Sequence, residues 1–226
     1  MQTQTTTETI EFNGWTMRIR PSESTNPRLL VMIHGLTGDE NSMWVFARRF
    51  SSKYWIVAPR APHPANPQGF SWRVNPLSIE EARNNQTNRP GLDALKTSAE
   101  ALIKLIDEYA ASVKMEADVF DAIGFSQGAA MVNILGMLYP KRVRKMGVLA
   151  GFVPSGLDEY VSQRVLTGKH IFVAHGTQDE MVPIDRARAS MQLLEQAGAS
   201  ITYCEDEVGH KLSSNCLRAL EEYLTD

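Results

Sequence analysis

The chain has 226 residues, of which 43% are hydrophobic and 22% are charged, and its formal net charge is −3 at pH 7. These values are ordinary for a globular protein with a full apolar core, and the length fits one large α/β domain or two small ones. The densest basic run, KRVRK at residues 141–145, is more typical of a solvated helix end than of a nucleic-acid patch. We therefore expect no nucleic acid among the partners.

The sequence carries no sign of membrane insertion, secretion or metal binding. No apolar run reaches the ~18 residues that a transmembrane helix needs, and residues 1–12 lack the regions of a signal peptide. Without such a signal, Cys204 and Cys216 indicate free thiols in a reducing compartment, so we expect a cytoplasmic protein. No CxxC pair or HExxH helix occurs, so no metal site is expected.

The first predicted element is a hairpin with a type I′ turn, because residues 9–20 alternate apolar and polar around Asn13-Gly14. Short continuous apolar runs then predict strands that are buried on both faces. These runs lie at residues 28–33, 54–58, 119–123, 145–150, 170–174 and 200–204. Helical patterns alternate with them, at residues 43–50, 92–109, 131–138, 187–197 and 217–224.

This alternation predicts an α/β fold built from βαβ units. The central sheet would be mostly parallel and flanked by helices, with the N-terminal hairpin as an antiparallel edge. Nothing splits the chain, so residues 1–226 are expected to form a single domain. Residues 59–91 hold six prolines and little periodicity, which predicts a Pro/Asn-rich loop or a small cap. It would lie at the edge of the sheet where ligands bind.

The sequence Gly124-Phe125-Ser126-Gln127-Gly128 fits the pattern G-x-S-x-G. This pattern places a serine nucleophile on a sharp strand-to-helix turn, where the residues on either side crowd each other and must be very small. The context is the expected one, because an apolar run precedes Ser126 and a helical pattern follows it. The alternative is an incidental serine in a turn.

A nucleophilic serine needs a base, and the order on this scaffold is serine, then acid, then histidine. His210 fits best, because it follows the last predicted strand and precedes the last helix. His175 lies at the end of a strand before a glycine, where local hydrogen bonds in the turn are the simpler interpretation. His170 begins that same strand and so lies at the opposite edge of the sheet.

Asp179 is the best candidate for the acid, because it stands in the loop that leaves the strand ending near His175. Its rivals are Glu180, Asp158 and Asp185. Glu180 is adjacent and would point elsewhere, and Asp158 follows the preceding strand. Asp185 lies where a helix should start, so an acidic residue in a first helical turn explains it.

An oxyanion intermediate needs two preorganised N–H donors. One should be the backbone N–H after the nucleophile, which belongs to Gln127. The other should come from the loop after the first central strand, and Gly35 in that loop directs the next N–H, that of Leu36, inward. The alternative is a Gly-rich turn that serves geometry only.

Five stretches occur in an order that resembles a known family: HGLTGDE, APRAP followed by GFSW, GFSQGAAM, HGTQDEMVP and EVGH. They resemble the phospholipase/carboxylesterase family of α/β-hydrolases, which includes acyl-protein-thioesterase-like enzymes and small bacterial esterases. The resemblance runs from about residue 30 to residue 212. It implies an α/β-hydrolase fold and a serine hydrolase without a cofactor. Its substrates would be carboxylic esters, with thioesters or lysophospholipids as alternatives.

The resemblance also implies roles for individual residues. Ser126, Asp179 and His210 match the catalytic triad, and the N–H groups of Leu36 and Gln127 match the oxyanion donors. An apolar acyl pocket would be lined by Trp72, Met181 and Val182, which the resemblance implies, and by Phe152, an apolar residue that follows a predicted strand. Each of the four can equally be a core residue.

The partner expected from these features is a small-molecule ester, and homodimer formation stays open. Two other functions also stay open. One is a serine peptidase or a lyase on the same scaffold, since a fold does not fix a reaction. The other is a binding protein without catalysis, which would not need the serine, the acid and the histidine together.

Overall fold

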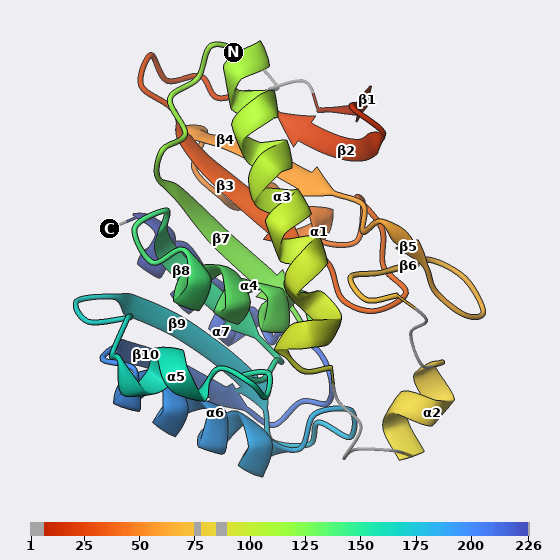
Figure 1. Ribbon diagram of the computed structural model, residues 1–226, viewed down its shortest axis with the longest axis vertical. Helices are drawn as coiled ribbons and strands as arrows, with labels where there is room; N and C mark the ends of the chain where they lie inside the picture. The colour runs from red at the N-terminus through yellow and green to blue at the C-terminus, as the bar shows by residue number, and fades with distance from the viewer. Residues whose placement is uncertain (1–6, 75–77, 85–89, 226) are drawn as a thin grey trace.

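The computed structural model describes residues 7–74, 78–84 and 90–225. Within this part an eight-stranded sheet forms the centre, in the order β1-β2-β4-β3-β7-β8-β9-β10 (Figure 1). Its strands are β1 (Glu8–Phe12), β2 (Trp15–Arg20), β3 (Arg28–Ile33), β4 (Tyr54–Pro59), β7 (Phe120–Phe125), β8 (Val143–Leu149), β9 (His170–Gly176) and β10 (Ser200–Asp206). Neighbours from β4 to β10 are parallel, whereas β2 pairs antiparallel with both β1 and β4. The predicted sheet and its antiparallel edge are confirmed.

The hairpin turn at the N-terminal edge has the expected chemistry. Asn13 and Gly14 have φ angles of 48° and 82°, and a type I′ turn requires positive φ at both central residues. Asparagine and glycine tolerate this region better than other residues do. The turn therefore sets the register, in which Phe12 faces Trp15.

Helices cover both faces of the sheet (Figure 1). Side chains of α3 (Leu92–Ser112), α4 (Gln127–Leu138) and α6 (Ile184–Gln196) join one apolar cluster, and those of α1 (Trp44–Ala47) and α7 (Ser214–Thr225) join another. Strand β3 contributes to both, because successive side chains point to opposite faces. Leu29, Val31 and Ile33 join the first cluster, and Leu30 and Met32 join the second. Burial on both faces explains the unbroken apolar runs.

The strand order places a ligand crevice at one edge of the sheet. Strand β3 lies between β4 and β7. The connection from β3 to β4 therefore runs to one side of β3, and the connection from β4 to β7 crosses to the other side. In open α/β sheets ligands bind at such a switch point, beside the carboxyl ends of the strands. The loops after β3, β7, β9 and β10 all begin at this edge, and they carry the candidate residues.

Residues 59–91 contain more regular structure than the sequence indicated. Strands β5 (His63–Pro64) and β6 (Phe70–Ser71) form a small antiparallel pair, and α2 (Ile79–Asn84) follows. Phe70 bonds the loop after β3 twice, since its carbonyl accepts from Thr37 N–H at 2.9 Å and its N–H donates to Gly38 at 3.0 Å. Residues 75–77 and 85–89 lie outside the described part. A single domain with this segment as loop or small cap stays a prediction.

Candidate active site

Ser126 occupies the turn between the last residue of β7 and the first residue of α4. Its φ of 54° and ψ of −114° form a strained backbone conformation for a residue with a Cβ atom. Hydrogen bonds hold the turn, because its N–H donates to the Leu149 carbonyl at 2.9 Å and its carbonyl accepts from Ala129 N–H at 3.0 Å. A serine on a strained strand-to-helix turn is the arrangement that presents a nucleophile.

The glycines that flank this turn are required by sterics. A Cβ atom on Gly124 would lie 2.2 Å from the Gly128 carbonyl oxygen. A Cβ atom on Gly128 would lie 2.0 Å from the carbonyl oxygen of Ile33. Both obstacles are backbone atoms, which cannot rotate away as a side chain could. The expected crowding on either side of Ser126 is therefore present, and it also presses α4 against β3.

Asp179 and His210 lie side by side at the carboxyl edge of the sheet. His210 Nδ1 lies 2.7 Å from Asp179 Oδ2. The other carboxylate oxygen of Asp179 accepts the backbone N–H groups of Met181 and Val182, each at 2.8 Å. The His210 ring packs on Phe125, the residue before Ser126, with 4.9 Å between ring centroids. The contacts thus connect acid, imidazole and the serine turn in sequence.

Burial and hydrogen bonding set the charge state of this pair. The Asp179 side chain is 0% exposed, and that of His210 is 21% exposed. Burial raises the pKa of the Asp179 carboxyl, but the hydrogen bonds from His210 and Val182 outweigh it, so this pKa lies below its usual range. Asp179 is therefore an anion at neutral pH, and its Oδ2 can only accept from His210 Nδ1–H. The Nε2 atom of His210 is then left to act as a base.

The loop that carries His210 packs on the loop that carries Asp179. Gln178 N–H donates to the Val208 carbonyl at 3.1 Å, and Thr177 N–H donates to the Asp206 carbonyl at 2.9 Å. Gly176 makes this approach feasible, because a Cβ atom there would lie 2.2 Å from the Val208 carbonyl oxygen. A glycine at the end of β9 therefore lets the two loops meet.

His175 also lies beside the Asp179 carboxylate. Its side chain is fully buried, and its Nε2 lies 2.8 Å from the Val182 carbonyl and 3.4 Å from Asp179 Oδ2. Burial lowers the pKa of His175, and this outweighs the opposing effects of Val182 and Asp179. The ring is thus neutral, with its proton on Nε2. The expected local hydrogen bonds in the turn are confirmed.

The other rivals lie elsewhere. His170 begins β9 and bonds Thr202 through its ring at 2.6 Å, away from the carboxyl edge. Asp158 begins α5 (Asp158–Ser162), and Asp185 lies in the first turn of α6, as the sequence indicated. Glu180 is exposed. Of these candidates, Asp179 is the one in contact with His210.

The loop after β3 touches the serine turn. A Cβ atom on Gly35 would lie 3.2 Å from the Cβ atom of Ser126, so the two backbones are in close contact. The loop is fixed by the bond from Gly38 N–H to the Gly35 carbonyl, at 3.1 Å. In the described part of the chain, the N–H groups of Leu36 and Gln127 donate to no other protein group. Both are therefore available to an oxygen atom of a ligand.

Comparison with known protein families gives a match over most of the chain. The family model described as Phospholipase/Carboxylesterase matches residues 16–226. This chain belongs to the phospholipase/carboxylesterase family. The family is hydrolytic, and the resemblance of the five sequence stretches is confirmed.

The chain is similar to several relatives within the phospholipase/carboxylesterase family. It is 24% identical to a probable carboxylesterase SOBER1-like protein of Arabidopsis thaliana, over 92% of this chain and 82% of the relative. Acyl-protein thioesterase 1 of Debaryomyces hansenii is 28% identical, over 75% and 77% of the two chains. A rice relative (Oryza sativa subsp. japonica), 26% identical over 91% and 89%, is named a probable inactive carboxylesterase. The activity of an individual member therefore has to be measured.

Solved structures of carboxylesterases share the fold. A carboxylesterase from Mesorhizobium loti superimposes with a TM-score of 0.80 at 21% identity, covering 97% of this chain and 98% of that one. At this identity the likeness shows the fold alone. The α/β-hydrolase fold expected from the sequence is confirmed.

The side chain of Gln127 has a role that the sequence did not reveal. It is buried, and its Oε1 accepts the backbone N–H of Trp72 at 2.9 Å. The same amide contacts the hydroxyl of Ser71, with Oε1 at 3.3 Å and Nε2 at 3.2 Å. Gln127 connects the serine turn to the segment after β4.

The residues expected to line an acyl pocket lie around the site but are mostly buried. Trp72 is 0% exposed; its Nε1–H donates to the His34 carbonyl at 2.9 Å, and its ring packs on His34. Val182 and Phe152 are also buried, whereas Met181 is partly exposed. These positions suit core packing, and the acyl-pocket role of all four stays a prediction.

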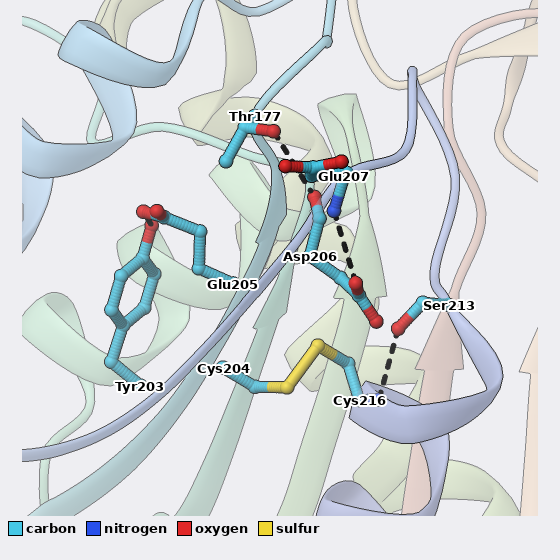
Figure 2. Close-up of a disulfide and its surroundings, with 8 residues drawn as sticks. All are labelled: Thr177, Tyr203, Cys204, Glu205, Asp206, Glu207, Ser213 and Cys216. Carbon is cyan, nitrogen blue, oxygen red and sulfur yellow. Dashed lines mark hydrogen bonds between the residues drawn. A yellow bond between two sulfur atoms is a disulfide. The ribbon is translucent and has the colours of Figure 1, made fainter.

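The two cysteines form a disulfide, so the expectation of free thiols is wrong. Cys204 on β10 and Cys216 on α7 are joined, with 5.5 Å between their Cα atoms (Figure 2). The absence of a signal peptide indicated free thiols, whereas α7 folds back along β10 and brings the sulfur atoms together. The cytoplasmic location rested on free thiols, so it stays a prediction without that support.

Two further findings concern the described residues alone. None of their helices combines the length and the apolar character that crossing a bilayer requires. No three of their His, Cys, Asp or Glu side chains gather closely enough to hold a metal ion.

Proposed function

We propose that this protein hydrolyses carboxylic esters through an acyl-enzyme on Ser126. The observation that carries the proposal is the position of His210. Its ring is held on the buried Asp179 carboxylate at 2.7 Å and packs on Phe125, which directly precedes Ser126. A serine, a base and an orienting acid on loops at one edge of the sheet are what nucleophilic acyl transfer needs.

In the proposed first step, His210 Nε2 takes the proton of Ser126 as Oγ attacks the ester carbonyl carbon. Asp179 keeps the imidazole in the required tautomer and stabilises the imidazolium that forms. The carbonyl oxygen, now negative, receives the N–H groups of Leu36 and Gln127. Gln127 begins α4, a helix of 12 residues, so the positive end of the helix dipole also faces the developing charge.

The second step repeats this geometry with water. His210 protonates the leaving alcohol, and the acyl group remains on Ser126. Water then attacks the acyl carbon while His210 accepts its proton, and collapse of the second intermediate releases the acid and regenerates Ser126. All the groups involved belong to this chain, so the proposed reaction consumes only ester and water.

Thioesters are the second substrate class that we propose. A relative whose match covers 75% of this chain is named acyl-protein thioesterase 1. A thiol leaving group needs no change in the roles of Ser126, His210 or Asp179. Peptidase or lyase activity on the same scaffold is the alternative that the substrate panel addresses.

The test is hydrolysis of p-nitrophenyl esters with acyl chains of two to sixteen carbons, beside an acyl thioester, a peptide amide and the Ser126→Ala variant. We expect saturable ester hydrolysis, reduced by about 10³-fold or more in the variant. The proposal fails if folded protein hydrolyses no ester, or if Ser126→Ala retains the wild-type rate. Cleavage of the peptide amide in preference to every ester would favour the peptidase.

A further inference from the structure

The disulfide spans the loop that carries His210. Cys204 lies on β10 and Cys216 in the first turn of α7, twelve residues apart, and His210 stands midway between them. The bond therefore closes the loop of residues 204–216, and His210 is its middle residue. Figure 2 shows the cross-link between the end of the strand and the start of the helix.

One end of this loop leaves an edge strand of the sheet. Strand β10 lies at the edge of the described sheet, where β9 is its neighbour. Beyond Asp206 the backbone bonds of the loop are mainly local, such as Val208 N–H to the Asp206 carbonyl at 2.8 Å and Lys211 N–H to the Gly209 carbonyl at 2.7 Å. Among the described residues, two backbone bonds join this region to the loop of Asp179: the Val208 carbonyl accepts from Gln178 N–H, and the Asp206 carbonyl, at the end of β10, accepts from Thr177 N–H.

The start of α7 is held by packing and by a hydrogen bond to Ser213. Cys216 is 1% exposed and belongs to the apolar cluster under α7, and its N–H donates to Ser213 Oγ at 3.0 Å. Cys204 is partly exposed. The disulfide therefore joins a buried, well-packed position on the helix to the end of an edge strand. It limits how far β10 and α7 can separate, and with them the two ends of the loop.

We propose that the Cys204–Cys216 disulfide is a positioning element for His210, so that the cross-linked protein is the active form and its reduction slows turnover. This inference rests on the proposed function, because it assigns His210 the role of base. A displacement of about 1 Å at a catalytic group can cost about 100-fold in rate. Without the cross-link, the two ends of the loop are held by β10 and α7 alone, which can separate further while the remaining fold is intact.

The reduction is a thiol–disulfide exchange with an external dithiol. A thiolate of the dithiol attacks the sulfur of partly exposed Cys204, forms a mixed disulfide, and expels the Cys216 thiolate, which takes a proton. The second thiol of the reagent then attacks the mixed disulfide and releases Cys204 as a thiol. The protein gains two electrons and two protons, and the dithiol leaves as its own disulfide.

The experiment compares the oxidised and reduced forms of the full chain. Thiols are counted in denatured samples before and after treatment with dithiothreitol, and kcat and KM are measured with p-nitrophenyl acetate at a temperature where circular dichroism shows both forms folded. We expect no free thiols per chain before dithiothreitol treatment and two after it. In the reduced form kcat should be lower by about 10–100-fold, and KM should change less than threefold. A stabilising bond without a positioning role would leave kcat unchanged at that temperature.

Two further measurements separate positioning from general damage. The proton on His210 Nδ1, held by Asp179, should give a downfield proton resonance that is lost or broadened on reduction. The double variant Cys204→Ala/Cys216→Ala should have the low kcat of the reduced form and should not respond to dithiothreitol. A response in this variant would show that the reagent acts elsewhere, and would overturn the proposal.

The remaining outcomes are decisive as well. The proposal is overturned if the reduced wild type keeps kcat within twofold of the oxidised form. It is also overturned if protein purified without reductant, and then treated with a mild oxidant, still contains two free thiols. Oxidised protein that hydrolyses no ester and forms no fluorophosphonate adduct at Ser126 would overturn the proposed function. Equal hydrolysis by the oxidised and reduced forms would overturn the positioning role alone.

Discussion

His210 Nδ1 lies 2.7 Å from Asp179 Oδ2, and Asp179 is completely buried. A buried carboxylate must be compensated by hydrogen bonds, and Asp179 also accepts the N–H groups of Met181 and Val182. The pair therefore fixes both the tautomer and the orientation of the imidazole. The predictions below follow from this contact and from those around it.

Replacing the acid should slow the chemical step. We expect Asp179→Asn to lower kcat by about 10³–10⁴-fold while KM changes little, because the amide favours the wrong tautomer of His210. Glu180→Gln is the matched control, since this neighbouring carboxylate is exposed, and it should retain wild-type kcat. Steady-state kinetics on an ester substrate measure both. Turnover within a few-fold of wild type in Asp179→Asn would contradict the acid assignment.

Acid should destabilise the fold through His175. Burial lowers the pKa of this ring, so the unfolded chain binds the proton more readily than the folded protein does. Stability is then complete above the unfolded pKa of about 6.5 and falls as the pH drops below it. Buried His34, whose pKa burial also lowers, acts in the same direction.

Urea unfolding between pH 7.5 and pH 5 measures this dependence. His175→Gln should have a shallower dependence of unfolding free energy on pH than the wild type, because one of the two buried imidazoles is gone. His170→Gln is the control, since this residue is exposed. An unchanged slope in His175→Gln would show that His175 is not protonated on unfolding in this range.

The predicted elements agree with the structure where local pattern decides them. The apolar runs became strands because both faces of the sheet are covered by helices, so each strand is apolar along its length. Asn13 and Gly14 fixed the hairpin because few other residues adopt positive φ. The serine turn was predictable for the same reason, since Gly124 and Gly128 leave no room for side chains.

The errors lie where distant segments meet. Cys204 and Cys216 pair because α7 packs along β9 and β10, and no local pattern reports that packing. The anchoring of Trp72 by the Gln127 amide joins residues 55 positions apart. The pair β5 and β6 includes Pro64 and forms against the local preference for irregular structure, where Phe70 also bonds the loop after β3. Tertiary contacts overrode sequence expectation in each case.

The glycine beside the serine turn should tolerate no side chain. Gly128→Ala places a Cβ atom 2.0 Å from the Ile33 carbonyl oxygen, so β3 and α4 must move apart. We expect a loss of at least about 3 kcal/mol in unfolding free energy, measured by urea denaturation. Gly91→Ala is the control, because the new atom would meet the rotatable Ser155 hydroxyl at 2.8 Å. Equal stability of the two variants would contradict the steric argument.

The Gln127 amide should contribute to stability separately from its backbone N–H. Gln127→Met keeps the side-chain volume but leaves the buried Trp72 N–H without its acceptor. The expected loss is about 1–3 kcal/mol, with kcat reduced far less than in Asp179→Asn. Exposed Gln178 is the control position, where Gln178→Met should be neutral. A neutral Gln127→Met would mean that water replaces the amide at no cost.

The central claim is that Ser126 is a nucleophile activated by His210. Intact-mass and peptide analysis after treatment with a fluorophosphonate tests it most directly. The account predicts one adduct on Ser126 in folded wild-type protein, none in Ser126→Ala, and labelling at least about 100-fold slower in His210→Ala. Folded wild-type protein that gains no adduct, or gains it on another residue, would contradict the account.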